Sequence, residues 1–330
     1  MSSLKNRYEI LALIQAKMCN PNGDPDMGNR PRIDLETNHG IITDVAVKSR
    51  IRAYIEDAYA DVPGCKILIT NGANINKAIA GAVLDANGVT ELKETNTKVN
   101  EAAAIMCEKY WDVRTFGGVL STGLNAGQVR GAVQVGMSTS VNPIEVEEIS
   151  ITRKAFTDNK SFTNIADYEK AETKMSEASK RTIGNKQYTP YGLYVMKMTV
   201  SANLAQKVGF TEEDLQMLLE SIIQMYDNSI SSSKMGMSVL TPVIVFKHVG
   251  THCAGDPLNE KESLLGCVSS YKLFDLLDIH KKDDIEFARD YKDYNIQLRL
   301  SELPNGVECY AKDGAFSSLR QLMSGTDITL

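Results

Sequence analysis

The chain is poor in the residues that build metal centres and covalent catalytic sites. Its 330 residues include 4 histidines, 1 tryptophan and 6 cysteines, and the cysteines are scattered without a CxxC pair. The spacing His248-x3-His252-Cys253 is typical of metal ligands, but a fourth ligand is not evident. There is no phosphate-binding GxxxxGK[ST] loop, no GxGxxG after a strand and no Gly-x-Ser-x-Gly nucleophile turn. These absences favour a binding protein over an enzyme, and we expect no cofactor and no bound metal.

Long apolar runs and a leader-like start are also lacking. No run approaches the roughly 20 apolar residues that a membrane helix needs. The first residues, MSSLKNRYE, are polar and charged. Scattered cysteines in this setting are typical of reduced thiols. We therefore expect a cytoplasmic protein that does not span a membrane.

Acidic charge prevails over the whole chain, whose formal net charge is -6. The two signs are nevertheless separated along the sequence. Basic residues outnumber acidic ones between 150 and 190, whereas acidic residues prevail from Thr251 onward. Net charge is therefore a poor guide to what the protein binds. The pattern predicts a middle segment that binds a polyanion and an acidic C-terminal part with a second docking face.

Hydrophobic periodicity predicts a mixed α+β domain. Alternating patterns predict strands at 8–16, 125–140, 191–203, 239–249 and 295–300, and 111–120 is expected to be extended. Helical spacing predicts helices at 43–59, 76–84, 102–110, 211–229 and 264–277. The buried stripe of the first helix comprises Val47, Ile51, Tyr54, Ile55 and Ala58. Strand, helix, strand, strand, helix, strand with insertions is the ferredoxin-like order, whose antiparallel sheet is a common platform for single-stranded RNA.

The segment from Met18 to Asp34 is a polar loop on which the rest of the chain is organised. Its prolines and glycines end the first strand, and it presents the guanidinium groups of Arg30 and Arg32. The helix that follows carries three further cations: Lys48, Arg50 and Arg52. A solvated helix face gives the same pattern. The position of these cations, one helix away from the loop, favours a binding role.

Two later segments offer further polar groups. Gln128 and Arg130 alternate with apolar residues in the strand predicted at 125–140, as in an RNA-facing sheet or in a half-solvated strand without a ligand. Just before it, Phe116 is followed by Gly117 and Gly118, which permit a close backbone approach. The basic segment 150–190 has too little apolar content to pack alone, so we expect it to protrude from the core.

Two stretches together resemble a known family. Asn20-Pro-Asn-Gly-Asp-Pro-Asp-Met-Gly-Asn-Arg-Pro-Arg, followed by Gly40-Ile-Ile-Thr-Asp-Val-Ala-Val-Lys-Ser-Arg-Ile-Arg, resembles the N-terminal signature of the backbone subunit of type I CRISPR Cascade complexes. This is CRISPR-associated protein family seven, and the resemblance is greatest to subtype I-C. Segments 127–134 and 149–155 resemble later parts of the same family, so the likeness spans at least the first 190 residues.

The resemblance implies a function in antiviral defence. It implies one elaborated domain over 1–330, built on a modified RNA-recognition-like palm. The polar loop would cover 18–38, a finger-like insertion 61–110 and a basic thumb-like insertion 140–190, and 251–330 would complete the palm. Copies would polymerise head to tail into a helical filament along the guide RNA (crRNA) and present it to target DNA, together with the large, small and guide 5'-end-binding subunits.

The resemblance also implies roles for individual residues. Guide phosphates and 2'-hydroxyls need cations and small polar groups that do not read sequence. We expect these from Asn20, Asn22, Arg30, Arg32, Lys48, Arg50, Arg52, Gln128, Arg130, Arg153, Lys154, Ser231, Ser232 and Lys234. The thumb needs an apolar wedge that displaces bases, for which Phe156 and Ile183 are the candidates, with a buried packing role as the alternative.

Two other functions stay open on the sequence. Related backbone subunits of type III complexes cut bound target RNA with a divalent metal and a loop aspartate, and Asp24 and Asp26 lie in a comparable loop. Neither belongs to a calcium-loop pattern. A small-molecule enzyme whose Pro/Gly loop forms a lid would instead purify as a monomer without nucleic acid.

Overall fold

A computed structural model describes residues 3–157, 161–176, 181–228 and 230–330. The chain is centred on β1 (Tyr8–Cys19), which lies between β10 (Thr182–Val200) and β11 (Met237–His248) and is antiparallel to both. Nine consecutive residues of β1, from Tyr8 to Ala16, are buried. The prediction of a central strand at 8–16 is therefore confirmed.

The main sheet has nine strands, and its principal path is β15-β14-β11-β1-β10-β8-β4. β7 and β9 also pair with β10. Within this path β11, β1, β10 and β8 are neighbours in that order. If these four strands are numbered by their order in the chain, their order in the sheet is fourth, first, third, second. The remaining strands of the sheet are β4 (His39–Ile42), β7 (Val133–Val135), β8 (Ser138–Pro143), β9 (Glu147–Arg153), β14 (Val307–Lys312) and β15 (Arg320–Leu322).

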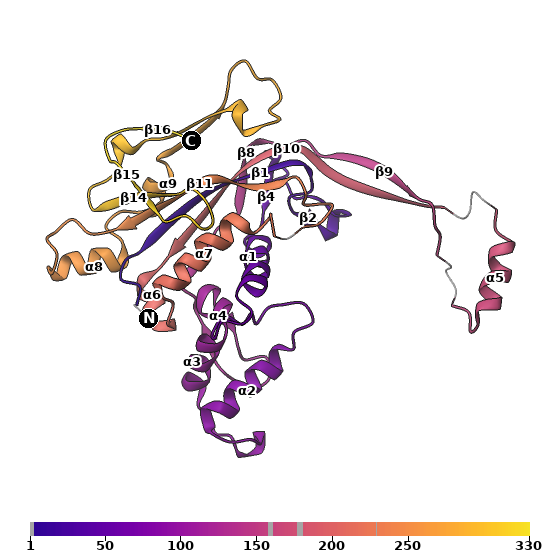
Figure 1. Cartoon of the computed structure of the whole chain (residues 1–330), viewed down its shortest axis with the longest axis horizontal. Helices are drawn as coiled ribbons and strands as arrows, with labels where there is room; N and C mark the ends of the chain where they lie inside the picture. Colours follow the sequence, from indigo (N-terminus) through magenta and orange to yellow (C-terminus); the bar gives the residue numbers. More distant parts are fainter. Residues whose placement is uncertain (1–2, 158–160, 177–180, 229) are drawn as a thin grey trace.

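Helices cover one face of this sheet, and a small second sheet covers the other (Figure 1). Residues of β1 alternate between the two layers: Ile10, Ala12 and Ile14 pack with the helices, whereas Leu11 packs on the C-terminal side. The helical layer contains α1 (Asp44–Ala58) and α7 (Glu212–Gln224). The second sheet consists of β12 (Leu277–Lys281), β13 (Tyr294–Leu298) and β16 (Ile328–Thr329).

Segment 63–130 forms a lobe with a separate apolar cluster, beside the helical face (Figure 1). Its elements are α2 (Ile75–Asn87), α3 (Val99–Lys109), α4 (Trp111–Phe116), β5 (Gly118–Val119) and β6 (Gln128–Val129). The prediction of an extended segment at 111–120 was wrong for its first half. All six residues of α4 are buried, so the segment shows neither helical nor strand periodicity.

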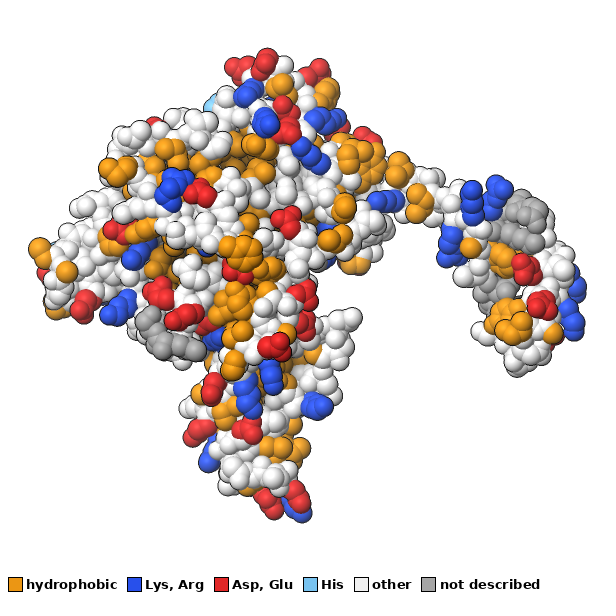
Figure 2. All heavy atoms as spheres, in the orientation of Figure 1, with side chains coloured by type: hydrophobic (Ala, Val, Ile, Leu, Met, Phe, Trp, Pro, Cys, Tyr) orange, Lys and Arg blue, Asp and Glu red, His pale blue; other side chains and the backbone are white. Residues whose placement is uncertain are grey.

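An arm projects from the sheet, as Figures 1 and 2 show. β9 and the first part of β10 form its two-stranded stem, and α5 (Ile165–Thr173) lies at its far end. Cationic side chains gather toward that end, while apolar side chains follow the stem (Figure 2). The expected protrusion at 150–190 is confirmed, but its stem is regular antiparallel sheet.

Short elements complete the fold. β2 (Gly23–Asp24) and β3 (Arg30–Pro31) form a small ladder inside the polar loop. The remaining helices are α6 (Ala202–Val208), α8 (Pro257–Leu265) and α9 (Ser270–Phe274). One helix predicted over 264–277 is wrong, because Gly266 adopts a φ of 101° between α8 and α9. No helix in the described ranges is long and apolar enough to cross a membrane.

The two helices predicted best are those with clear caps. α1 begins after Thr43, whose side chain accepts a hydrogen bond from the backbone of Ala46, and it buries Val47, Ile51, Tyr54 and Ile55 as expected. Ala58, assigned to the same stripe, is exposed at the end of the helix. α7 begins with the predicted capping box of Thr211 and Asp214. Ser229, at the predicted end of that helix, lies outside the described residues.

Candidate nucleic-acid interface

The polar loop after β1 is joined to the loop 230–236 that precedes β11. The amide of Lys17 donates to the carbonyl oxygen of Gly236 at 2.8 Å, and the amide of Asn20 donates to that of Ser233 at 2.9 Å. A Cβ atom at Gly236 would lie 1.7 Å from the Lys17 carbonyl oxygen, so only glycine permits this approach. We call this region the loop junction, and define it as residues 17–22 together with 230–236.

Lys234 lies inside the loop junction. Its ammonium donates to the carbonyl oxygen of Asn20 at 2.6 Å and to that of Pro21. Burial, reinforced by the nearby positive charge of Arg50, lowers the pKa of Lys234 to about 8. The structure therefore brings together the predicted residues Asn20, Arg50 and Lys234 from three separate segments.

The polar loop is also fixed by its own side chains. The Asn22 side-chain oxygen accepts from the backbone amide of Thr43 at 2.9 Å, which ties the loop to the start of α1. Asn20 is buried, and its amide donates to the carbonyl oxygen of Asn29 at 2.6 Å. The predicted roles of Asn20 and Asn22 thus include holding the loop in place.

The two arginines of the loop are both half-buried, and Ser231 and Ser232 line the facing loop. Arg32 Nη1 lies 3.1 Å from Asp24 Oδ2. The Asp24 carboxylate also accepts from the amide of Asp26 at 3.1 Å, where it caps a short 3-10 helix over Pro25–Met27. Both oxygens of Asp24 are therefore engaged within the loop.

The cations of α1 are divided between two places. Residues four apart share a helix face, so Lys48 and Arg52 point together and Arg50 points elsewhere. Lys48 Nζ and Arg52 Cζ lie 5.8 and 5.2 Å from the centre of the Phe116 ring. Lys48 also pairs with Asp44 at 2.8 Å, and Arg52 with the buried Asp112 at 2.9 Å. Only Arg50 among the three reaches the loop junction.

Phe116 borders a cavity of about 360 Å³ that Gln128 and Arg130 line as well. Both of these side chains are exposed. A Cβ atom at Gly131 would lie 2.3 Å from the amide nitrogen of Gly117, so the backbones cross closely, as the glycines after Phe116 predicted. The structure thus groups Gln128 and Arg130 with Phe116, and through this ring with Lys48 and Arg52.

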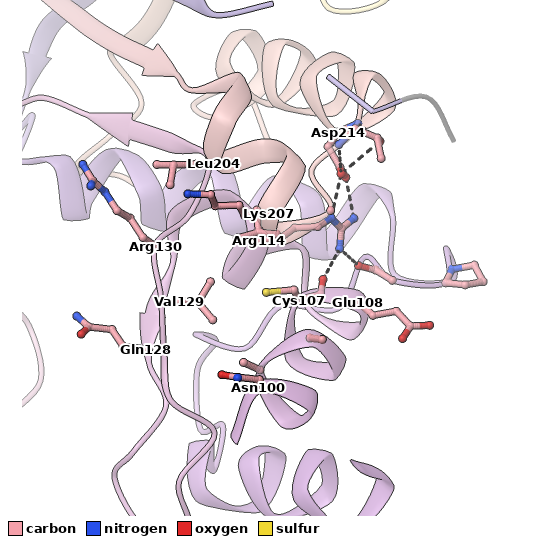
Figure 3. Close-up of a pocket in the computed structure, with 17 residues that line it drawn as sticks. Asn100, Cys107, Glu108, Arg114, Gln128, Val129, Arg130, Leu204, Lys207 and Asp214 are labelled. Carbon is pink, nitrogen blue, oxygen red and sulfur yellow. Dashed lines mark hydrogen bonds and ion pairs between the residues drawn. The ribbon is translucent and has the colours of Figure 1, made fainter. Parts of the chain in front are cut away.

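A larger cavity of about 780 Å³ lies between the lobe and α6 (Figure 3). Its walls include Cys107, Val129 and Leu204, and Lys207 and Arg130 also line it. Arg114 lies in the same cavity, where its bonds to Asp214 occupy the guanidinium. Sequence reasoning missed this cavity, because its walls come from segments that are far apart in the chain.

The other predicted residues lie on the arm, away from the loop junction (Figure 1). Arg153, Lys154 and Ile183 are exposed, and Phe156 is half-buried. Ile183 pairs with Thr152, whereas Ile151 pairs with Gly184, so the two isoleucines lie on opposite faces of the stem. Arg153 shares the face of Ile151.

Lys186 is a candidate that the sequence analysis did not single out. It lies on β10, and its ammonium is 3.4 Å from the carbonyl oxygen of Ser232 in the loop junction. Burial raises the pKa of the Cys19 thiol to about 11, and the nearby positive charges of Lys234 and Lys186 oppose this rise. Its place in the basic segment 150–190 was a signal that could have identified Lys186.

The possible ligand set around His248 has another explanation. His248 is fully buried, and its Nε2 lies 2.6 Å from Glu9 Oε2, whereas His252 is exposed and contacts Thr251. No group of three or more His, Cys, Asp or Glu side chains suited to a metal occurs in the described part of the chain. His248 therefore belongs to a buried polar network in the core.

Comparison with known proteins gives one family. The model of the family described as CRISPR-associated protein Cas7 matches residues 6–299. A protein of Haloferax volcanii named CRISPR-associated protein Cas7 is 28% identical over 293 residues, which cover 83% of this chain and 79% of that protein.

Two solved structures show a weaker likeness. A chain of a "CRISPR RNA-guided surveillance complex, pre-nicking" has 14% identity and a TM-score of 0.44, covering 73% of this chain and 78% of that chain. A chain of a "CRISPR RNA-guided surveillance complex" has 14% identity and a TM-score of 0.42, covering 82% and 80%.

Proposed function

Because this chain belongs to the CRISPR-associated protein Cas7 family, we propose that it is the crRNA-binding backbone subunit of a type I CRISPR Cascade complex. The observation that carries the proposal is the loop junction. There Arg50, Lys186 and Lys234 come together from three elements at one end of the central strand. Cations and small polar groups at fixed positions can bind the phosphates and riboses of an RNA strand. Such contacts do not depend on the base sequence.

The fold supports a modified RNA-recognition-like palm. The neighbouring strands β11, β1, β10 and β8 have the fourth-first-third-second order of a ferredoxin-like sheet. In the proposal 61–110 is the finger, 140–190 is the thumb, and 251–330 completes the palm. The arm lies within this thumb range, whose first residues belong to β8 of the main sheet. The lobe extends beyond this finger range to β6. β14 and β15, which lie within 251–330, extend the main sheet, and this supports the palm assignment.

The arm supports assembly with further copies. Its stem exposes Ile149 and Ile151 on one face and Ile183 on the other. Such surfaces are expected to be covered in a complex. We propose that copies join head to tail, which is a heterologous contact that does not close, and so form open helical assemblies on crRNA in the cytoplasm. Target DNA and the other Cascade subunits are the remaining proposed partners.

Co-purification tests the proposal. The protein is expressed beside a guide array, and its nucleic acid is extracted and sized. The proposal predicts RNA of uniform length and an open assembly of many copies. A monomer that purifies without nucleic acid would contradict it, and a closed twofold dimer in the presence of guide RNA would contradict head-to-tail growth.

We also propose subtype I-C, on the resemblance of segments 20–32 and 40–52. The test is co-expression of this chain with the other subunits of one type I system at a time, in separate strains. The proposal predicts a stable complex with subunits of a I-C system. Assembly only with those of another subtype would contradict it.

A further inference from the structure

The Lys234 ammonium connects the two sides of the loop junction. It donates to the carbonyl oxygens of both Asn20 and Pro21, which belong to the opposite side of the loop junction. Bonds from a charged donor are stronger than those from a neutral one. The protonated side chain is therefore a clamp between the two loops.

The surroundings of this clamp carry positive charge on several elements. Arg50 approaches from α1, and Lys186 approaches from β10. Cys19 of β1 is the other titratable group that acts on Lys234, and its own pKa is raised to about 11 by burial. Tyr226, which follows the end of α7, is near Arg50, and burial raises its pKa above the ordinary value. Neither the thiol nor the phenol therefore titrates near neutral pH.

We propose that Lys234 is a positioning residue that holds the loop junction in its RNA-binding form only when protonated, so that RNA binding at this junction is coupled to proton uptake by Lys234. This inference rests on the proposed function and adds its regulation by pH. Burial is the larger cause of the lowered Lys234 pKa and the charge of Arg50 is the smaller one. A phosphate beside both cations would oppose both causes through its negative charge and would favour the charged clamp.

The expected size follows from linkage. In the free protein the Lys234 pKa is about 8, against an ordinary value of 10.5. If bound phosphate restores the ordinary value, RNA affinity falls about tenfold between about pH 7 and about pH 9, because the free clamp must first gain a proton. The RNA affinity is lost at alkaline pH, because Lys234 of the free protein is already protonated below its pKa of about 8.

The test is RNA affinity of the full chain as a function of pH, measured at constant salt with a single-stranded RNA of mixed sequence. Lys234→Arg keeps the charge and is expected to bind RNA with little dependence on pH. Lys234→Met is expected to bind more weakly at pH 7 and also without dependence on pH. Lys186→Met is the matched control, which should lose affinity but keep the tenfold pH effect.

Calorimetry in buffers of different ionisation heat supplies the second readout. The wild-type chain should take up close to one proton per subunit near pH 9, and Lys234→Arg none. Equal affinity of the wild-type chain at both pH values, or a pH effect that persists in both Lys234 variants, overturns the inference alone. Failure to bind RNA at any pH overturns the proposed function and this inference with it.

Discussion

The Arg114 guanidinium and the Asp214 carboxylate form two parallel charge-assisted bonds, of 2.9 Å from Nε to Oδ2 and of 2.7 Å from Nη2 to Oδ1. Arg114 lies in α4 of the lobe and Asp214 in the first turn of α7, and both are buried. Arg114 Nη1 also donates to the carbonyl oxygen of Gly64 at 2.6 Å. The pair therefore ties the lobe to the helical layer of the sheet.

Removing one partner of this pair should destabilise the protein strongly. Arg114→Met leaves the Asp214 carboxylate buried without its counter-charge, and we expect the free energy of unfolding to fall by roughly 3–5 kcal/mol. Urea unfolding at neutral pH measures the change. The matched control is Arg320→Met, which breaks an exposed pair with Asp313 of similar geometry and should change stability little. Equal effects of the two substitutions would contradict this role.

The ionisation of Glu9 should make the free energy of unfolding depend on pH in the acidic range. Burial opposes its ionisation, but bonds from His248 and Arg7 outweigh burial and keep the pKa of Glu9 below its ordinary value. Its contribution is present above the ordinary carboxyl pKa and is lost as pH falls through the lowered one. Glu9→Gln should cost roughly 2 kcal/mol at pH 7. Unfolding at several pH values should show this gap closing in acid, and a constant gap would count against the prediction.

Lys48 and Arg52 should affect RNA binding through the Phe116 cavity. Neutralising both is expected to flatten the salt dependence of RNA affinity, by about 0.7 in logarithmic slope for each phosphate that is no longer neutralised. The single variants separate binding from stability. Arg52→Met removes the charged partner of Asp112, which keeps the bonds from the amides of Leu68 and Ile69. This change should cost roughly 2 kcal/mol of unfolding free energy, whereas Lys48→Met should cost little. An unchanged salt slope in the double variant would exclude both residues from binding phosphate.

Ile183 is the better of the two wedge candidates, because its side chain is 72% exposed whereas Phe156 is half-buried. A wedge that unstacks bases should leave them reactive toward chemical probes at regular intervals along the bound RNA. Ile183→Ala is expected to weaken this periodic reactivity without altering thermal stability. Ile151→Ala, on the opposite face of the same stem, is the control and should preserve the pattern. Loss of the pattern in Ile151→Ala alone would reverse the assignment.

Asp24 should not support RNA cleavage. Its carboxylate caps the short helix at Pro25 and pairs with Arg32, so it is already bound within the polar loop. Purified complex mixed with magnesium and complementary RNA is expected to leave that RNA intact. Periodic cleavage that Asp24→Ala abolishes would instead favour the ribonuclease function of type III-like subunits.

The elements that the sequence predicted well are those with local signals. β1 is rich in aliphatic residues because both of its faces are buried, and α7 begins with a capping box that four adjacent residues define. α4 was missed because burial on every side removes the periodicity that marks a helix. The break between α8 and α9 depends on one glycine conformation.

The candidate site was predicted in composition more than in arrangement. Lys48, Arg50 and Arg52 lie within five residues of sequence, yet Arg50 joins the loop junction and the other two face Phe116. The partner of Arg52, Asp112, is 60 residues away, and a single sequence carries no signal for such a pair. The clamp of Lys234 likewise depends on carbonyl groups, which every residue has.

A density map of the particle assembled on its guide tests the central claim most directly. We predict that the ribose-phosphate strand passes the loop junction of each copy, with phosphates beside Arg50 and Lys186. A map in which that junction faces solvent while the strand follows another surface would contradict the account.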